Sequence, residues 1–156
     1  MNKELLTELK EKFDSLKKET GFKSSFKELN DIFFIEDFIL QEKYVSRDFA
    51  RQLCSRIVNV YNSWVSYFHG LIMPNPANMI NIMENKCLNE EERKKISKLI
   101  RGVIGLISTN NLNFLTKNKT AQAKFIDDSV KFWKNYFKAE AIKIIEKINK
   151  EWKKSS

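Results

Sequence analysis

Between Ile57 and Met83 the chain contains no Lys, Arg, Asp or Glu, although charged residues make up 31% of the sequence. Elsewhere in the chain, the solvated faces of the predicted helices are built from Lys and Glu. Because charged side chains are almost always exposed, a segment without them is expected to lie out of bulk water. Either the rest of the domain or a partner must therefore cover this segment.

Sparse turn residues favour an all-α fold. The 156 residues include only 4 Gly and 2 Pro, too few for the turns of a many-stranded β fold. Apolar residues such as Leu5, Leu9 and Phe13 instead recur at helical spacing. A chain of this length can bury about two thirds of its unfolded surface. We therefore predict one helical domain over residues 1–156, a bundle of five to six helices with a long third helix at its centre.

Capping signals locate the helix ends. The first helix is expected over residues 2–20, and Ser25 with Glu28 reads as a capping box that opens the second. Ser46 is expected to cap the third helix, which continues to about Met73. The remaining predictions are a helix over 76–86, a helix after Asn89, an Asn-rich loop over 109–118 and a last helix over 120–153 with a break near Ala139.

Two features indicate a cytoplasmic protein. Cys54 and Cys87 are too few for a disulfide framework, and reduced thiols are usual inside cells. Residues 2–19 are charged throughout, and no run of about 18 apolar residues occurs. We therefore expect no signal peptide, no membrane-spanning helix and no membrane partner.

The uncharged segment has the composition of a protein interface. Interface cores are depleted in Lys, Glu and Asp and enriched in Tyr, Trp and Met. The predicted surface, for another protein chain or for a second copy of this one, consists of Tyr61, Trp64, Tyr67, Met73, Met79 and Met83. Trp64 also fits a core position, because it shares a helix face with Tyr61 and Phe68. In the alternative interpretation, the third helix is the spine of the core.

A second face of the third helix is polar and almost uncharged. Small and amide side chains recur there at steps of three and four residues. Such a polar stripe can pack at helix crossings, or it can offer hydrogen bonds to a partner protein or a small polar ligand. Its members are Arg56, Asn59, Asn62, Ser63, Ser66 and His69.

All of the net charge of +8 lies in residues 87–156. Residues 1–86 hold 12 basic and 12 acidic side chains, whereas residues 87–156 hold 16 and 8. Such an asymmetry favours an anionic partner, for example RNA or DNA. Candidate phosphate contacts form one row at Lys94, Lys98 and Arg101 and a second row at Lys143, Lys147 and Lys150. The alternative is two ordinary solvated helix faces, since glutamates interrupt the second row.

Signals for catalysis, a metal or a cofactor are weak. His69 is the only histidine, the cysteines lack Cys-x-x-Cys spacing, and no phosphate-binding glycine loop or nucleophile motif occurs. A small-molecule site or active site would have to gather Tyr67 and His69 with Arg56 and Glu36. Glu36 lies among apolar residues, where a buried carboxylate would more simply form a structural ion pair. We expect a non-enzymatic protein without cofactor or metal.

Three functions stay open, and each predicts a different structural feature. A non-enzymatic interaction module acting through residues 57–83 would expose the polar stripe. A nucleic-acid-associated protein using residues 87–156 would place both basic rows on one surface. A small-molecule binder or enzyme would have a cavity where Arg56, Glu36 and His69 converge.

Overall fold

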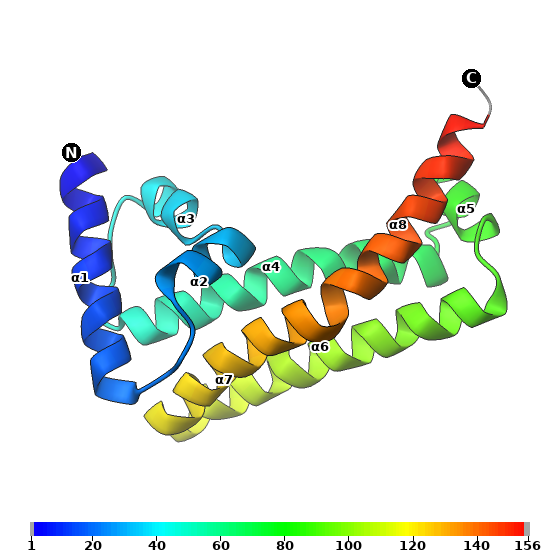
Figure 1. Cartoon of the computed structure of the whole chain (residues 1–156). Helices are drawn as coiled ribbons and strands as arrows, with labels where there is room; N and C mark the ends of the chain where they lie inside the picture. The colour runs from blue at the N-terminus through cyan, green and yellow to red at the C-terminus, as the bar shows by residue number, and fades with distance from the viewer. Residues whose placement is uncertain (1, 155–156) are drawn as a thin grey trace. The chain divides into compact units, whose positions relative to one another are not determined.

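The computed structural model describes residues 2–154, in which every regular element is a helix and no strand occurs (Figure 1). The elements are α1 (Asn2–Thr20), α2 (Phe26–Phe33), α3 (Ile35–Glu42), α4 (Phe49–Ile72), α5 (Met79–Lys86), α6 (Glu90–Thr116), α7 (Lys119–Phe132), the π-helical segment η1 (Trp133–Phe137) and α8 (Lys138–Lys153). The all-α prediction is confirmed. Within these residues no helix has the length and apolar character needed to cross a bilayer.

The predicted count of five to six helices is too low, because the segment after Ser25 forms two helices. Phe34 separates α2 from α3 in a left-handed conformation, with φ 53° and ψ 54°. Its backbone N–H still donates to the carbonyl of Asn30, and the Asn30 side chain accepts the N–H of Glu36 at 2.9 Å. One asparagine therefore helps to hold both helices at the break.

Two capping signals act as predicted. In the Ser25 capping box, the N–H of Glu28 donates to the Ser25 hydroxyl at 3.1 Å, and the N–H of Ser25 donates to the Glu28 carboxylate. Asn89 forms an equivalent reciprocal pair with Glu92 at the start of α6, with bonds of 2.9 and 2.8 Å. These side chains accept backbone N–H groups that have no partner within the helix.

Two other predicted helix starts were wrong. Asp48, and not Ser46, caps α4. The Asp48 side chain accepts the N–H of Arg51 at 3.2 Å. The short fourth helix of the prediction begins at Met79 rather than at residue 76, with Asn78 as its cap. In both cases a second capping residue lies two or three positions further along the chain.

The predicted Asn-rich loop over 109–118 is mostly helix, since α6 continues to Thr116. Asn110 and Asn113 are buried, and the Asn113 amide donates to the carbonyl of Ala121 in α7 at 3.1 Å. Burial with a partner offsets the poor helix propensity of asparagine. The chain turns at Lys117, whose φ is 51°.

The residues group into two compact units. Unit 1 is Met1–Val60 with Leu106–Lys131, and unit 2 is Tyr61–Gly105 with Phe132–Ser156. Helices α4 and α6 each contribute residues to both units. The single domain over residues 1–156 stays a prediction.

In unit 1, α1 lies beside α3 (Figure 1). Phe13 of α1 is buried and makes edge-to-face contacts with Phe22 and Phe26 at 5.4 and 5.2 Å. The Asp127 carboxylate of α7 accepts the backbone N–H groups of Lys23 and Ser24. A carboxylate thus joins the α1–α2 connection to α7.

The core of unit 2 is aromatic. Tyr61, Phe68 and Phe137 are fully buried, and the Phe137 ring contacts the other two at 5.7 and 6.0 Å. Phe137 ends the π-helical segment, in which the N–H of Lys138 donates to the carbonyl of Trp133. The predicted break near Ala139 therefore corresponds to a local change of helical period.

Candidate functional site

Two asparagines of α5 fix this helix against the end of α4. The Asn81 side chain lies over Gly70, where its Oδ1 would be 3.3 Å from an added Cβ atom. The Asn85 amide donates a hydrogen bond to the carbonyl of Leu71. Gly70 is thus the point of close approach between the two helices.

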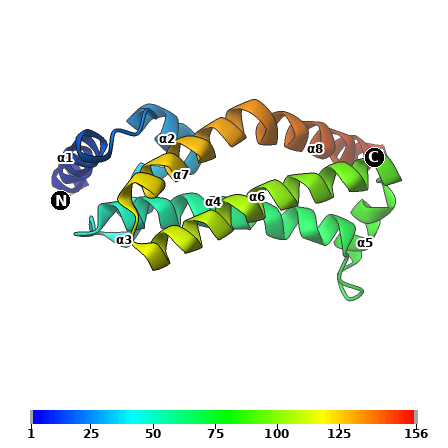
Figure 2. The same ribbon diagram turned by 90° about the horizontal axis from the view of Figure 1, so that it is seen from below.

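An apolar surface lies around this junction. Figure 2 shows the connection between α4 and α5 as a projecting loop. Four large apolar side chains in and after this connection are exposed: Met73 by 65%, Met79 by 72%, Ile80 by 60% and Met83 by 46%. We call these four residues the methionine face.

The polar stripe of α4 is also largely exposed. Asn59, Asn62, Ser63, Ser66 and His69 all lie on the surface. Their exposure does not fit the alternative in which these residues pack at helix crossings. The spacing from Asn62 through Ser66 and His69 to Met73 keeps them on one side of α4.

Arg56 differs from the rest of the stripe. Its side chain is half-buried, its Nε donates to the carbonyl of Phe33 at 2.7 Å, and its guanidinium lies over the Phe38 ring at 5.2 Å. Burial lowers the pKa of Arg56, and Asp37 opposes this shift. Arg56 therefore has a structural role at the α2–α3 break.

Three aromatic residues of the predicted interface do not belong to the exposed surface. Tyr61 is fully buried, so it cannot contact a partner, and burial raises its pKa. Trp64 and Tyr67 are half-buried at the edge of the core, where both rings contact Phe68 at 6.0 and 5.3 Å. Burial, and secondarily Glu84, raise the pKa of Tyr67. The predicted core position of Trp64 is therefore only partly correct, because its ring contacts the core but remains partly exposed.

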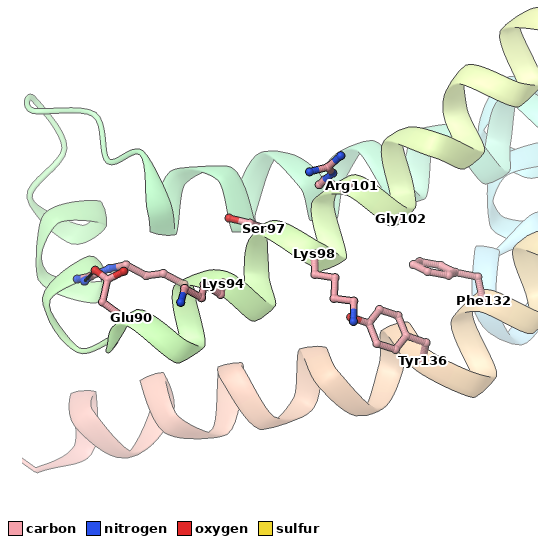
Figure 3. Close-up of a pocket in the computed structure, with 9 residues that line it drawn as sticks. Glu90, Lys94, Ser97, Lys98, Arg101, Gly102, Phe132 and Tyr136 are labelled. Carbon is pink, nitrogen blue, oxygen red and sulfur yellow. Dashed lines mark hydrogen bonds and ion pairs between the residues drawn. The ribbon is translucent and has the colours of Figure 1, made fainter.

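The first basic row lines a groove. Lys94, Lys98 and Arg101 are exposed on α6, and the groove of about 810 Å³ beside them is also lined by Phe132 and Tyr136 (Figure 3). All of these residues lie in unit 2. The row therefore faces an aromatic surface as well as solvent.

The second basic row is partly neutralised. Lys143 pairs with Glu140 at 3.4 Å, and Lys147 pairs with Glu92 of α6. Lys150 is exposed. Burial raises the pKa of Glu92. The backbone hydrogen bond at Asn89 and the Lys147 ammonium lower this pKa by more, so the net shift is downward. Lys147 therefore joins α6 to α8 and is not a free phosphate contact.

Two residues of the small-molecule alternative, Arg56 and His69, lie far apart along α4. Arg56 and His69 both lie on α4, and a helical rise of about 1.5 Å per residue separates their Cα atoms by roughly 20 Å. Glu36 is half-buried at the start of α3, and His69 is exposed. Within residues 2–154 no three His, Cys, Asp or Glu side chains are grouped so as to hold a metal ion.

Sequence reasoning missed three residues of these surfaces. Ile80 directly follows Met79 in the uncharged segment, so its exposure could have been considered with that of its neighbours. Phe132 and Tyr136 fit the apolar face of the last predicted helix. Each of them precedes Trp133 or Phe137 by one position and therefore points to a different side of the helix.

Comparison of the chain with protein-family models, with curated proteins and with solved structures finds no match.

Proposed function

We propose that the chain is a non-enzymatic helical interaction module that associates with a second copy of itself through the methionine face. The exposure of Met73, Met79, Ile80 and Met83 inside a segment without charge carries this proposal. Large exposed apolar side chains that lie close together in the chain are typical of interaction sites. Flexible methionine side chains also adapt well to an apposed surface.

Electrostatics favour a second copy as the occupant. With a net charge of +8, two copies repel each other when their basic surfaces approach. Residues 57–83 carry no charged side chain, so two copies can meet there without bringing like charges together. The same patch would then meet itself across a two-fold axis.

The polar stripe supplies the rest of the interface in this proposal. A stable interface buries about 800 Å² on each partner, more than four side chains cover. Asn62, Ser66 and His69 continue from Met73 along the same side of α4 and are exposed. They would form a hydrogen-bonding rim beside an apolar centre, the usual arrangement in interfaces.

The contacts beneath the methionine face support pre-organisation. Asn81 packs over Gly70, and Asn85 bonds to Leu71, so α5 is held before any partner arrives. A surface that is already ordered loses less conformational entropy on association.

Sedimentation velocity at about 1 to 100 μM tests the proposal. The wild-type chain should show a concentration-dependent dimer, and Met79→Lys should be monomeric because it places a like charge at the symmetric contact. Leu115→Lys is the matched control, since Leu115 is 84% exposed but lies in unit 1. A monomeric wild-type chain at the highest concentration, or a dimer unaffected by Met79→Lys, contradicts the proposal.

The same proposal includes a cytoplasmic location. It is supported by the free thiols Cys54 and Cys87, because free thiols persist in reducing compartments.

A further inference from the structure

A groove in unit 2 combines exposed positive charge with aromatic side chains. It runs between α6 and the π-helical segment, and its principal residues are Lys94, Lys98, Arg101, Gly102, Phe132 and Tyr136 (Figure 3). It is separate from the methionine face, with which it shares no residue.

The groove is strongly basic. Four basic side chains and one acidic side chain line it. The acidic one, Glu90, pairs with Arg93 at 3.4 Å, and Arg93 also donates to the carbonyl of Asn85 at 2.8 Å. Lys94, Lys98 and Arg101 are exposed, and none of them forms an ion pair within residues 2–154. Three cations in one row are thus available to an anionic ligand.

The aromatic wall is held in a fixed position. An added Cβ on Gly102 would lie 2.6 Å from Cζ of Phe132, so this ring packs directly on the α6 backbone. The Tyr136 ring contacts Phe132 at 5.5 Å and is half-buried. Figure 3 shows Lys98 reaching from α6 toward Tyr136. Aromatic rings and cations therefore line the same groove.

The aromatic residues around the π-helical segment divide between the core of unit 2 and the groove, because consecutive positions of a helix point in different directions. Trp133 and Phe137 stack on each other at 5.1 Å and contact the buried Tyr61. Phe132 and Tyr136, one position earlier in each case, line the groove. Segments of π-helix inside α-helices are frequent at functional sites.

We propose that this groove binds single-stranded nucleic acid. The row from Lys94 to Arg101 rises roughly 10 Å along α6. Each of the three cations along this row can contact one phosphate of the bound strand. Tyr136 stacks on a base of the strand. Known single-strand binding surfaces likewise combine a basic groove with aromatic side chains on which bases stack.

Fluorescence anisotropy tests the cationic part, with a labelled mixed-sequence DNA single strand of about 12 nucleotides as the probe. Replacement of Lys94, Lys98 and Arg101 by Gln should weaken binding. It should also reduce the slope of log affinity against log salt by about 2, because each single-strand phosphate contact contributes about 0.7.

The matched control replaces Lys86, Lys138 and Lys154 by Gln, three exposed lysines of unit 2 that do not line the groove. It removes the same charge and should leave most of the salt slope. Equal effects of the two triple variants, or no binding of the wild-type chain at low salt, overturn the proposal.

Two substitutions at Tyr136 test the stacking part. Tyr136→Ala should weaken binding by about 5-fold or more with an unchanged salt slope, whereas Tyr136→Phe, which keeps the ring, should bind as the wild type does. The competitors are the duplex of the same sequence and inorganic polyphosphate, and both should displace the probe less well than the unlabelled single strand. Equal competition by polyphosphate, or by the duplex, overturns single-strand recognition.

Discussion

At the scale of single residues, the two thiols differ sharply in their surroundings. Cys54 is fully buried in α4, and burial, with a smaller effect of Asp48, raises its pKa to about 12. Cys87 is only partly buried at the end of α5. Burial also raises the pKa of Cys87. Glu151 and Glu84 raise it by smaller amounts, and nearby lysines oppose the shift.

The native protein should therefore react with a disulfide reagent at Cys87 alone. At about pH 8 the reaction should be slower than for a free thiol and should accelerate as the pH rises, because only the thiolate reacts. Cys54 should react only after unfolding. Counting the released chromophore measures both sites, and Cys87→Ser should abolish the native reaction. Two equivalents released from the native chain would contradict the burial of Cys54.

The aromatic core of unit 2 gives a second residue-scale prediction. Phe137→Ala should lower the free energy of unfolding by about 3–5 kcal/mol, because Phe137 is fully buried among aromatic rings. Trp64→Ala should cost less than this, since Trp64 is only half-buried. Urea unfolding measures both values, and the reverse order would place Trp64 deeper than Phe137.

At the scale of helices, the two glycines of α6 should respond in opposite ways to substitution by Ala. Gly102 has no room for a side chain, because a Cβ would lie 2.6 Å from the Phe132 ring, whereas a Cβ added to Gly105 would meet nothing within 4 Å. Gly105→Ala should stabilise the protein by about 0.5–1 kcal/mol through helix propensity. Gly102→Ala should destabilise it by about 1–3 kcal/mol through overpacking. Thermal unfolding of the two variants measures both effects. If both variants were more stable than the wild type, helix propensity alone would decide and Gly102 would not be closely packed.

Local signals predicted some helix ends and missed others. The Ser25 and Asn89 caps were predictable, because the groups that bond lie within three residues of each other. The end of α6 was not, since Asn113 prefers a loop on propensity but is buried and bonds to Ala121 of α7. The break between α2 and α3 at Phe34 was not predictable either, because residues other than Gly rarely adopt a left-handed conformation. These helix ends depend on contacts between helices.

The surfaces were predictable to a similar extent. The missing charge located the segment that carries the methionine face, but it did not separate buried Tyr61 from exposed Met73. That difference depends on the neighbours that each side chain finds after folding. Charge counting likewise identified the row at Lys94, whereas the pairing of Lys147 with Glu92 required the fold.

At the scale of the whole molecule, the two proposed surfaces differ in charge. The chain has a net charge of +8, the methionine face lies in a segment without charged residues, and the groove holds three unpaired cations. Self-association brings two positive molecules together, whereas nucleic-acid binding brings opposite charges together. Dissolved salt screens both interactions.

Salt should therefore weaken nucleic-acid binding without weakening self-association. From about 50 to about 500 mM NaCl, self-association should stay constant or strengthen, because screening reduces repulsion between the copies and leaves apolar contacts intact. Over the same range the affinity for the single strand should fall steeply, because the release of counterions into a more concentrated salt solution gains less free energy. Sedimentation and anisotropy on the same preparation measure both. If the dimer also dissociates as salt rises, charged groups hold it together, and the methionine face is not the contact.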